Sequence, residues 1–257
     1  DDTGAIVHIG NTLLSCVQGT QSPPATCASS VPISGTGATG TNLSDNAYNM
    51  AWVNTVGGTG VFNSSTANFT RPSGTTVLFA GLYWSGEINA ATGGTAPPNP
   101  ALKGQVLFAT PTTAFQTIVA SQLDTTTGIG GAGSGFSGFA DVTALVQAAG
   151  SGTYAVGNLQ AATGQNRYGG WALIVVYRDA ALPLRDMTVF DGYLQISSTS
   201  ISNTISGFRT PASGAFTTTV GAVAFDGDLG ATGDAMRLNG VPLADAANPV
   251  NNFYNST

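Results

Sequence analysis

An unbroken apolar run at residues 171–177 is the feature that most constrains how this chain can fold. The run reads Trp-Ala-Leu-Ile-Val-Val-Tyr, follows the pair Gly169-Gly170 and ends before the charged pair Arg178-Asp179. Seven residues suit a β-strand and are too few for a typical helix. A strand without a polar side is usually covered on both faces. The sequence therefore predicts a central strand here, with the rest of the chain packed around it.

A second apolar run, at residues 76–84, resembles the first in character. It reads Thr-Val-Leu-Phe-Ala-Gly-Leu-Tyr-Trp, and we expect the two runs to share one core. Shorter segments rich in β-branched and aromatic residues predict further strands. These are residues 5–14, 48–53, 61–70, 105–110, 115–121, 153–160, 186–197, 201–208, 216–225 and 250–254, and residues 236–243 predict a short hairpin around the turn Asn239-Gly240.

One helix is predicted, at residues 141–149. Asp141 can accept hydrogen bonds from the free N–H groups of its first turn, and Gly150 can end it. The glycine-dense stretch at residues 128–138 predicts a mobile loop. Because turns rather than crossover helices connect the strands, the sheets should be antiparallel. The predicted fold is all-β, an antiparallel two-sheet sandwich of jelly-roll type with one short helix, in a single domain over residues 1–257.

The only two cysteines, Cys16 and Cys27, flank the turn-forming pair Pro23-Pro24. This spacing predicts a local disulfide that closes an N-terminal loop, as in proteins of oxidising compartments. The alternative is two buried free thiols. The chain begins at Asp1 without a methionine or an apolar leader, so we expect a mature chain from which a signal peptide has been removed.

Charged residues are scarce, at 8% of the 257 residues against about 25% in an ordinary soluble domain. The formal net charge is −6, and Lys103 is the only lysine. Binding of nucleic acid needs several basic side chains on one face, so this class of partner is not expected. No apolar run approaches the roughly 20 residues of a membrane-spanning helix. A surface of hydroxyl, amide and backbone groups favours an extracellular or cell-surface protein.

Three carboxylates in a glycine-rich loop form the sharpest local pattern. Asp226, Asp228 and Asp234 lie in the segment Asp-Gly-Asp-Leu-Gly-Ala-Thr-Gly-Asp. Carboxylates two residues apart can turn onto one hard cation, and Ca²⁺ is the ion that such loops favour. The spacing is not that of an EF-hand, because no glutamate closes the loop. The alternative is an Asp/Gly turn whose carboxylates accept hydrogen bonds from backbone N–H groups.

Catalytic chemistry has few residues to use. His8 is the only histidine and lies in a predicted strand, where a core or edge position is the simpler interpretation than a catalytic triad. Glu87 is the only glutamate, and Asp191 could supply the second carboxylate that a glycosidase needs. The alternative places Glu87 at a solvated strand end. Lys103 is interpreted as an edge residue that discourages aggregation rather than as a partner in an isopeptide crosslink.

Six phrases of the sequence together resemble the N-terminal region of long secreted bacterial surface proteins that continue into DUF11-type Ig-like repeats. The phrases are Gly10-Asn-Thr-Leu-Leu-Ser-Cys16, Val77-Leu-Phe-Ala-Gly-Leu-Tyr-Trp84, Ala140-Asp-Val-Thr-Ala-Leu-Val146, Gly170-Trp-Ala-Leu-Ile-Val-Val-Tyr177, Leu184-Arg-Asp-Met-Thr-Val-Phe-Asp-Gly192 and Gly227-Asp-Leu-Gly-Ala-Thr-Gly-Asp234. The resemblance implies placement at the cell surface and an adhesive or structural role. It carries no catalytic residues.

We therefore expect a non-enzymatic extracellular structural or adhesive protein that associates with itself or with other surface proteins, for example as the subunit of a self-assembling fibre. The alternative is a calcium-dependent carbohydrate-binding module that uses the loop at residues 226–234 and an exposed aromatic side chain such as Tyr168. A hydrolase that uses Glu87 is the third and least favoured hypothesis.

Overall fold

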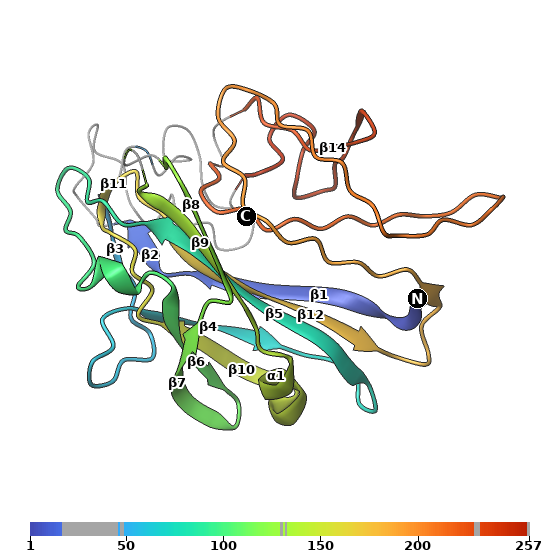
Figure 1. The fold of residues 1–257 in the computed structure, drawn as a ribbon, viewed down its shortest axis with the longest axis horizontal. Helices are drawn as coiled ribbons and strands as arrows, with labels where there is room; N and C mark the ends of the chain where they lie inside the picture. The colour runs from blue at the N-terminus through green and yellow to red at the C-terminus, as the bar shows by residue number, and fades with distance from the viewer. Residues whose placement is uncertain (17–45, 47–48, 129–130, 132, 229–231, 256–257) are drawn as a thin grey trace.

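A computed structural model describes residues 1–16, 46, 49–128, 131, 133–228 and 232–255 (Figure 1). Strand residues outnumber helical ones, at 39% against 5%. The mostly β, antiparallel architecture predicted from the sequence is therefore confirmed.

The largest sheet has six strands, and every pairing in it is antiparallel. Its central strands, β5 and β12, pair with each other and each has a second neighbour, β9 and β1 respectively. The predicted central position of residues 171–177 is therefore confirmed. In spatial order the strands are β13 (Leu184–Arg185), β1 (Asp2–Thr12), β12 (Gly169–Arg178), β5 (Thr76–Glu87), β9 (Gly135–Asp141) and β8 (Gln122–Thr126).

Three smaller sheets accompany it. A four-stranded sheet has the order β4 (Ser64–Phe69), β10 (Gly152–Gly157), β6 (Gln105–Thr110) and β7 (Thr113–Val119). A three-stranded sheet has the order β11 (Gly164–Gln165), β3 (Asn49–Trp52) and β2 (Leu14–Cys16), and β14 (Arg237–Leu238) pairs with β15 (Val241–Pro242).

The core lies between the six-stranded and four-stranded sheets, which form two layers in Figure 1. Leu82 and Leu173 contribute from the first layer and Phe108 and Tyr154 from the second, and all four are fully buried. Two buried indoles have polar partners: Trp171 Nε1 donates to Ser65 Oγ at 2.9 Å, and Trp84 Nε1 donates to the Lys103 carbonyl at 3.0 Å. The apolar runs at residues 76–84 and 171–177 therefore do share one core, as predicted.

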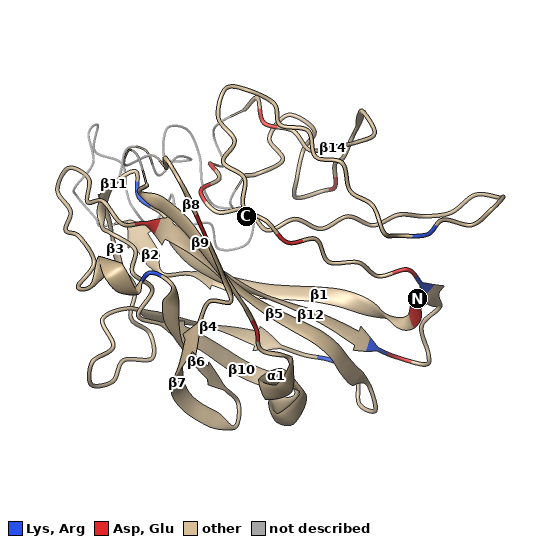
Figure 2. Cartoon of the chain, viewed as in Figure 1, with Lys and Arg blue, Asp and Glu red and all other residues tan. Residues whose placement is uncertain are grey.

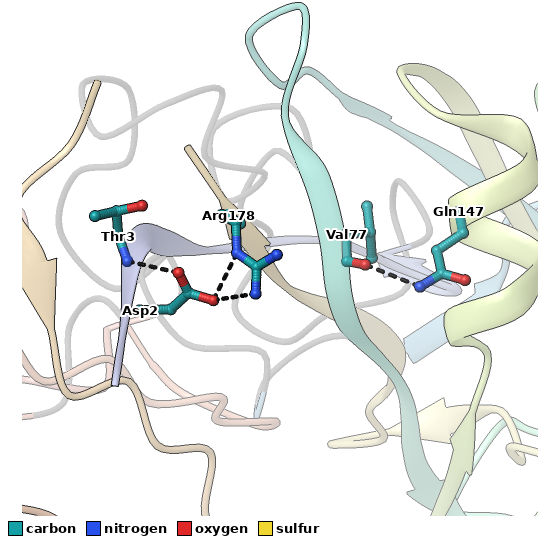
Figure 3. Close-up of polar contacts among 5 residues, drawn as sticks. All are labelled: Asp2, Thr3, Val77, Gln147 and Arg178. Carbon is teal, nitrogen blue, oxygen red and sulfur yellow. Dashed lines mark hydrogen bonds and ion pairs between the residues drawn. The ribbon is translucent and has the colours of Figure 1, made fainter. Parts of the chain in front are cut away.

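The predicted helix is present as α1 (Thr143–Ala149). Asp141 Oδ1 accepts the Thr143 N–H at 2.8 Å, and Gly150 follows the helix with φ = 69°. Gln147 Nε2 donates to the Val77 carbonyl at 2.9 Å, which attaches the helix to β5 (Figure 3). The same figure shows the Asp2–Arg178 ion pair, 2.6 Å long, which joins β1 to β12 at the end of their ladder.

The prediction of a loop at residues 128–138 is wrong in its second half, because β9 begins at Gly135. The reason is steric. Gly138 pairs with Trp84 across the β5–β9 ladder, and a Cβ added at Gly138 would overlap the Trp84 indole. Gly138 resembles a loop residue in the sequence, but in the fold it is a strand residue whose missing side chain leaves room for the Trp84 indole.

The three strands predicted at residues 186–197, 201–208 and 216–225 are also wrong. In the described structure these residues join no β-ladder. The segment at residues 186–225, named here the extended segment, runs in orange and red on the side of the six-stranded sheet opposite to β4, β6 and β10 (Figure 1). The final predicted strand, at residues 250–254, is likewise without a ladder.

The extended segment nevertheless has one side turned to the sheet. Met187 faces Gly4 of β1, and the Tyr193 hydroxyl lies 3.1 Å from that of Tyr168. At the far end, Phe225 faces Gly170 of β12. In the first part of the segment, the alternation that suggested a strand places Met187 and Tyr193 toward the rest of the fold, whereas residues 201–224 are exposed throughout.

Candidate functional site

The three aspartates of the predicted calcium loop have different neighbours. Asp234 Oδ1 accepts the Tyr254 N–H at 2.8 Å, and Asp228 Oδ2 accepts the Asn46 side-chain N–H at 2.7 Å. Within the described residues, no group of three or more His, Cys, Asp or Glu is placed to hold a metal ion. Residues 229–231 of the loop lie outside that part. The calcium site stays a prediction.

Asp226 belongs to a polar cluster at one end of the central strands, which is formed with Glu87, Ser134, Arg167 and Asp228. Burial raises its pKa to about 7, and the negative charges of Asp228 and Glu87 act in the same direction, while Arg167 opposes them. The backbone of Asp226 is left-handed, with φ = 68°, a conformation that Asp and Asn tolerate better than most residues. The end of the extended segment, where Asp226 is itself an exposed residue, therefore brings this carboxyl group toward Glu87 and Asp228.

Glu87 is the fixed member of this cluster, and its predicted position at a solvated strand end is wrong. It is the last residue of β5 and is fully buried. The Ser134 hydroxyl donates to one of its carboxylate oxygens. A Cβ at Gly128 would overlap the other oxygen. The side chain is closely packed on the sides where these residues lie.

Arg167 is the basic residue that sequence reasoning missed. Its side chain is buried, and it donates from Nε to the Asn89 carbonyl and from Nη1 to the Asn166 carbonyl, both at 2.8 Å. Its position, two residues before β12, was the available signal, because a charged residue beside a buried strand usually has a partner inside the fold.

The carboxylate pair proposed for a hydrolase is not the pair that the structure brings together. Asp226, rather than Asp191, is the aspartate whose pKa responds to Glu87. Tyr168, predicted to be an exposed sugar-binding ring, is instead partly buried, and burial raises its pKa. Its hydroxyl is engaged with that of Tyr193.

The remaining candidates lie apart from the cluster. His8 is exposed on β1, opposite Ile174. Because β13 pairs with β1 only at Asp2 and Thr3, His8 occupies an edge of the sheet, in agreement with the simpler of its two interpretations. Lys103 follows the 3₁₀ helix Pro100–Leu102. Cys16 ends β2 and Cys27 lies outside the described residues, so the disulfide stays a prediction.

The extended segment carries nine of the 17 exposed large hydrophobic residues of the described chain. It carries large hydrophobic side chains with between 37% and 56% of their area exposed. Charged side chains are few and isolated along the ribbon (Figure 2); within residues 186–225 they are Asp186, Asp191 and Arg209. The exposed apolar residues are Phe190, Leu194, Ile196, Ile201, Ile205, Phe208, Phe216, Val220 and Val223.

Comparison with known proteins finds no matching family, no matching curated protein and no matching solved structure. Among the described residues, no helix combines the length and apolar character needed to cross a membrane.

Proposed function

We propose that this protein is a non-enzymatic, extracellular structural or adhesive protein whose copies associate through the extended segment at residues 186–225. The observation that carries the proposal is the exposed apolar side of this segment, combined with a backbone that joins no ladder in the described structure. The jelly-roll topology and the single-domain organisation over residues 1–257 belong to the same proposal.

Two physical arguments support association. Exposed apolar patches of more than a few hundred Å² are rare on proteins that act alone, and each exposed side chain regains hydrophobic free energy when covered. Backbone N–H and C=O groups of an unpaired strand-like segment are also a template for a strand from another chain. With only Asp186, Asp191 and Arg209 charged in the segment, repulsion between two copies is small.

The partner proposed is a second copy of the same chain. Its extended segment can supply the neighbour that the first copy lacks, because it has the same unpaired backbone and the same exposed apolar side chains. Extracellular placement agrees with the low charge content, with the predicted Cys16–Cys27 disulfide and with the resemblance to secreted surface proteins.

Sedimentation velocity over a range of protein concentrations, with electron microscopy of the same samples, tests the proposal. We expect concentration-dependent oligomers or filaments from the wild-type chain. The triple variant Ile196→Thr, Ile201→Thr, Ile205→Thr should weaken association about tenfold or more, because it removes apolar area from the outer side of the segment.

The matched control exchanges equally exposed apolar residues on other elements. Val119 on β7 and Val241 on β15 are each 62% exposed, so Val119→Thr with Val241→Thr should leave association unchanged. A wild-type chain that stays monomeric at its highest soluble concentration contradicts the proposal, as does a control variant that is affected as strongly as the triple variant.

One observation favours the second candidate, a calcium-dependent carbohydrate-binding module. The pKa of Asp226 is raised partly by the charges of Asp228 and Glu87, and a bound cation would relieve that repulsion. Glycan-array binding that requires Ca²⁺, disappears with a chelator and is lost in Asp226→Asn would support this alternative over the first.

A further inference from the structure

A pocket of about 600 Å³ lies between the six-stranded sheet and the beginning of the extended segment. The sheet contributes a mainly aromatic wall, in which the Tyr83 and Phe139 rings lie 5.0 Å apart. The extended segment contributes the opposite wall. The residues that the argument uses are Phe79, Tyr83, Phe139, Met187, Val189 and Asp191.

Tyr83 places an unsatisfied polar group beside this pocket. Its hydroxyl is buried and has no hydrogen-bond partner among the residues that the structure describes, and burial raises its pKa to about 12, with the charge of Asp191 acting in the same direction. An unpaired buried hydroxyl costs free energy that a suitably placed ligand donor recovers. The hydroxyl can donate or accept, so it favours a ligand that brings a hydrogen-bonding group, of which an N–H group is one.

The charged side chains of the pocket determine which ligand charge it favours. Every charged side chain in its lining is an aspartate. Asp1 and Asp2 already have guanidinium partners, Arg209 at 3.4 Å and Arg178 at 2.6 Å. Asp191 has no ion-pair partner among the described residues. Partial burial and the nearby charge of Asp124 both raise its pKa, so a cation beside it would be stabilised.

We propose that this pocket binds a small organic ammonium ion with an aromatic or aliphatic body. The ammonium group lies at Asp191 and within reach of the Tyr83 hydroxyl, and the body lies against Phe79 and Phe139. Aromatic faces attract cations as well as apolar groups, and a few polar groups in an apolar pocket are the usual composition of a small-molecule site.

The second wall can adjust to such a ligand. Met187, Val189 and Asp191 belong to the extended segment, which no backbone ladder holds in place. Closure of this wall on a ligand needs no strand pair to break. Binding is independent of the association proposed above, because the pocket uses the inner side of the segment and association uses the outer side.

Three probes of similar shape test the proposal by isothermal titration calorimetry on the full chain, at a concentration where sedimentation shows monomer. The probes are 2-phenylethylammonium, the neutral 2-phenylethanol and the anion phenylacetate. We expect the ammonium ion to bind most tightly. Asp191→Asn should weaken the ammonium about threefold to fivefold, a modest change because Asp191 is exposed, and should leave the neutral probe unchanged.

Tyr83→Phe tests the contribution of the hydroxyl to ligand affinity separately from that of the ring. It should weaken the ammonium ion more than the alcohol, without loss of stability, since the hydroxyl that it removes is unpaired. Asp179→Asn is the matched control, because Asp179 accepts the Ala181 N–H in a turn and does not line the pocket; it should leave all affinities unchanged.

Equal affinity for the three probes, or no binding of the ammonium ion at millimolar concentration, overturns the proposal. So does a heat of binding that appears only at concentrations where the protein oligomerises, because the probe then binds between copies rather than in this pocket. Failure of these tests leaves the sedimentation result unaffected, so the two proposals fail separately.

Discussion

The paired central strands and the extended segment have similar sequences and opposite surroundings. Strands β5 and β12 bury Leu82, Trp84, Trp171 and Leu173 almost completely. Residues 186–225 are also rich in β-branched and aromatic residues, yet many of their apolar side chains remain about half exposed. The comparison teaches that apolar alternation specifies which side of a segment faces a sheet, whereas a strand also requires a neighbour for its backbone.

Backbone partners explain the difference. β12 has a ladder on each side, with β1 and with β5, so its amides and carbonyls are satisfied inside the protein. The extended segment has a few isolated bonds to the rest of the fold, such as the one that the Gly128 N–H donates to the side-chain Oε1 of Gln195 at 3.0 Å. Its exposed backbone groups depend mainly on water or on another chain.

Hydrogen exchange should give the largest contrast between the two regions. Amides in the ladders of β5 and β12 should exchange more slowly than those at residues 198–224 by a factor of about 10⁴ or more, because they open only with global unfolding. Mass spectrometry of deuterated peptides measures the difference. Under conditions of association, protection should rise in the extended segment, and a segment already protected in the monomer would contradict the described structure.

A matched pair of phenylalanine truncations should give the next largest contrast. Phe108 on β6 is fully buried and its ring lies 5.8 Å from that of Tyr154, whereas Phe190 is 47% exposed. Phe108→Ala should lower the free energy of unfolding by about 3–5 kcal/mol, and Phe190→Ala by about 0.5 kcal/mol or less. Urea denaturation measures both. Equal losses would mean that the extended segment is packed as tightly as the core.

Titration of Asp226, which follows the end of the extended segment, should give a smaller effect, seen in the pH dependence of stability. The folded pKa of Asp226 is about 7, above the value near 4 of an unfolded chain. The folded state therefore binds this proton more tightly, and stability falls as the pH rises from about 4 to about 7. Because Asp226 is an exposed residue, solvent screens the charges around it, and the loss should be on the order of 1 kcal/mol.

Asp226→Asn should remove this slope, since asparagine keeps the left-handed backbone and does not titrate. Asp179→Asn serves as the control and should keep the slope. The free energy of unfolding measured at pH 5 and at pH 8 decides the matter. A wild-type slope of the opposite sign, or one that the asparagine variant retains, contradicts the assignment.

Sequence reasoning predicted the layered core well and the polar cluster poorly. The runs around Leu78 and Ile174 are recognisable because burial on both faces leaves a local signature, an unbroken apolar stretch. The neighbours of Glu87 leave no such signature in the sequence, because Ser134, Arg167 and Asp226 come from separate loops that only the folded chain brings together. A single glutamate at a strand end gives no local indication of whether it faces water or the interior.

The prediction of strands in the extended segment failed for a different reason. The sequence of this segment satisfies every local test for strands, and pairing depends on which other segment is available. Residues 235–255 supply only the two-residue strands β14 and β15. The information that the prediction lacked is therefore non-local, and a partner outside the chain could supply it.

The fit of Gly138 beneath the Trp84 indole has a practical consequence for altering this protein. Stretches dense in glycine are the usual choice for inserting tags or shortening a chain, on the assumption that they merely connect. Here such a choice would strike a buried contact between two neighbouring strands, where even one methyl group has no room. An insertion into the exposed residues 201–224 would spare the core and would instead disturb the association proposed for the extended segment, so residue type alone misjudges both regions.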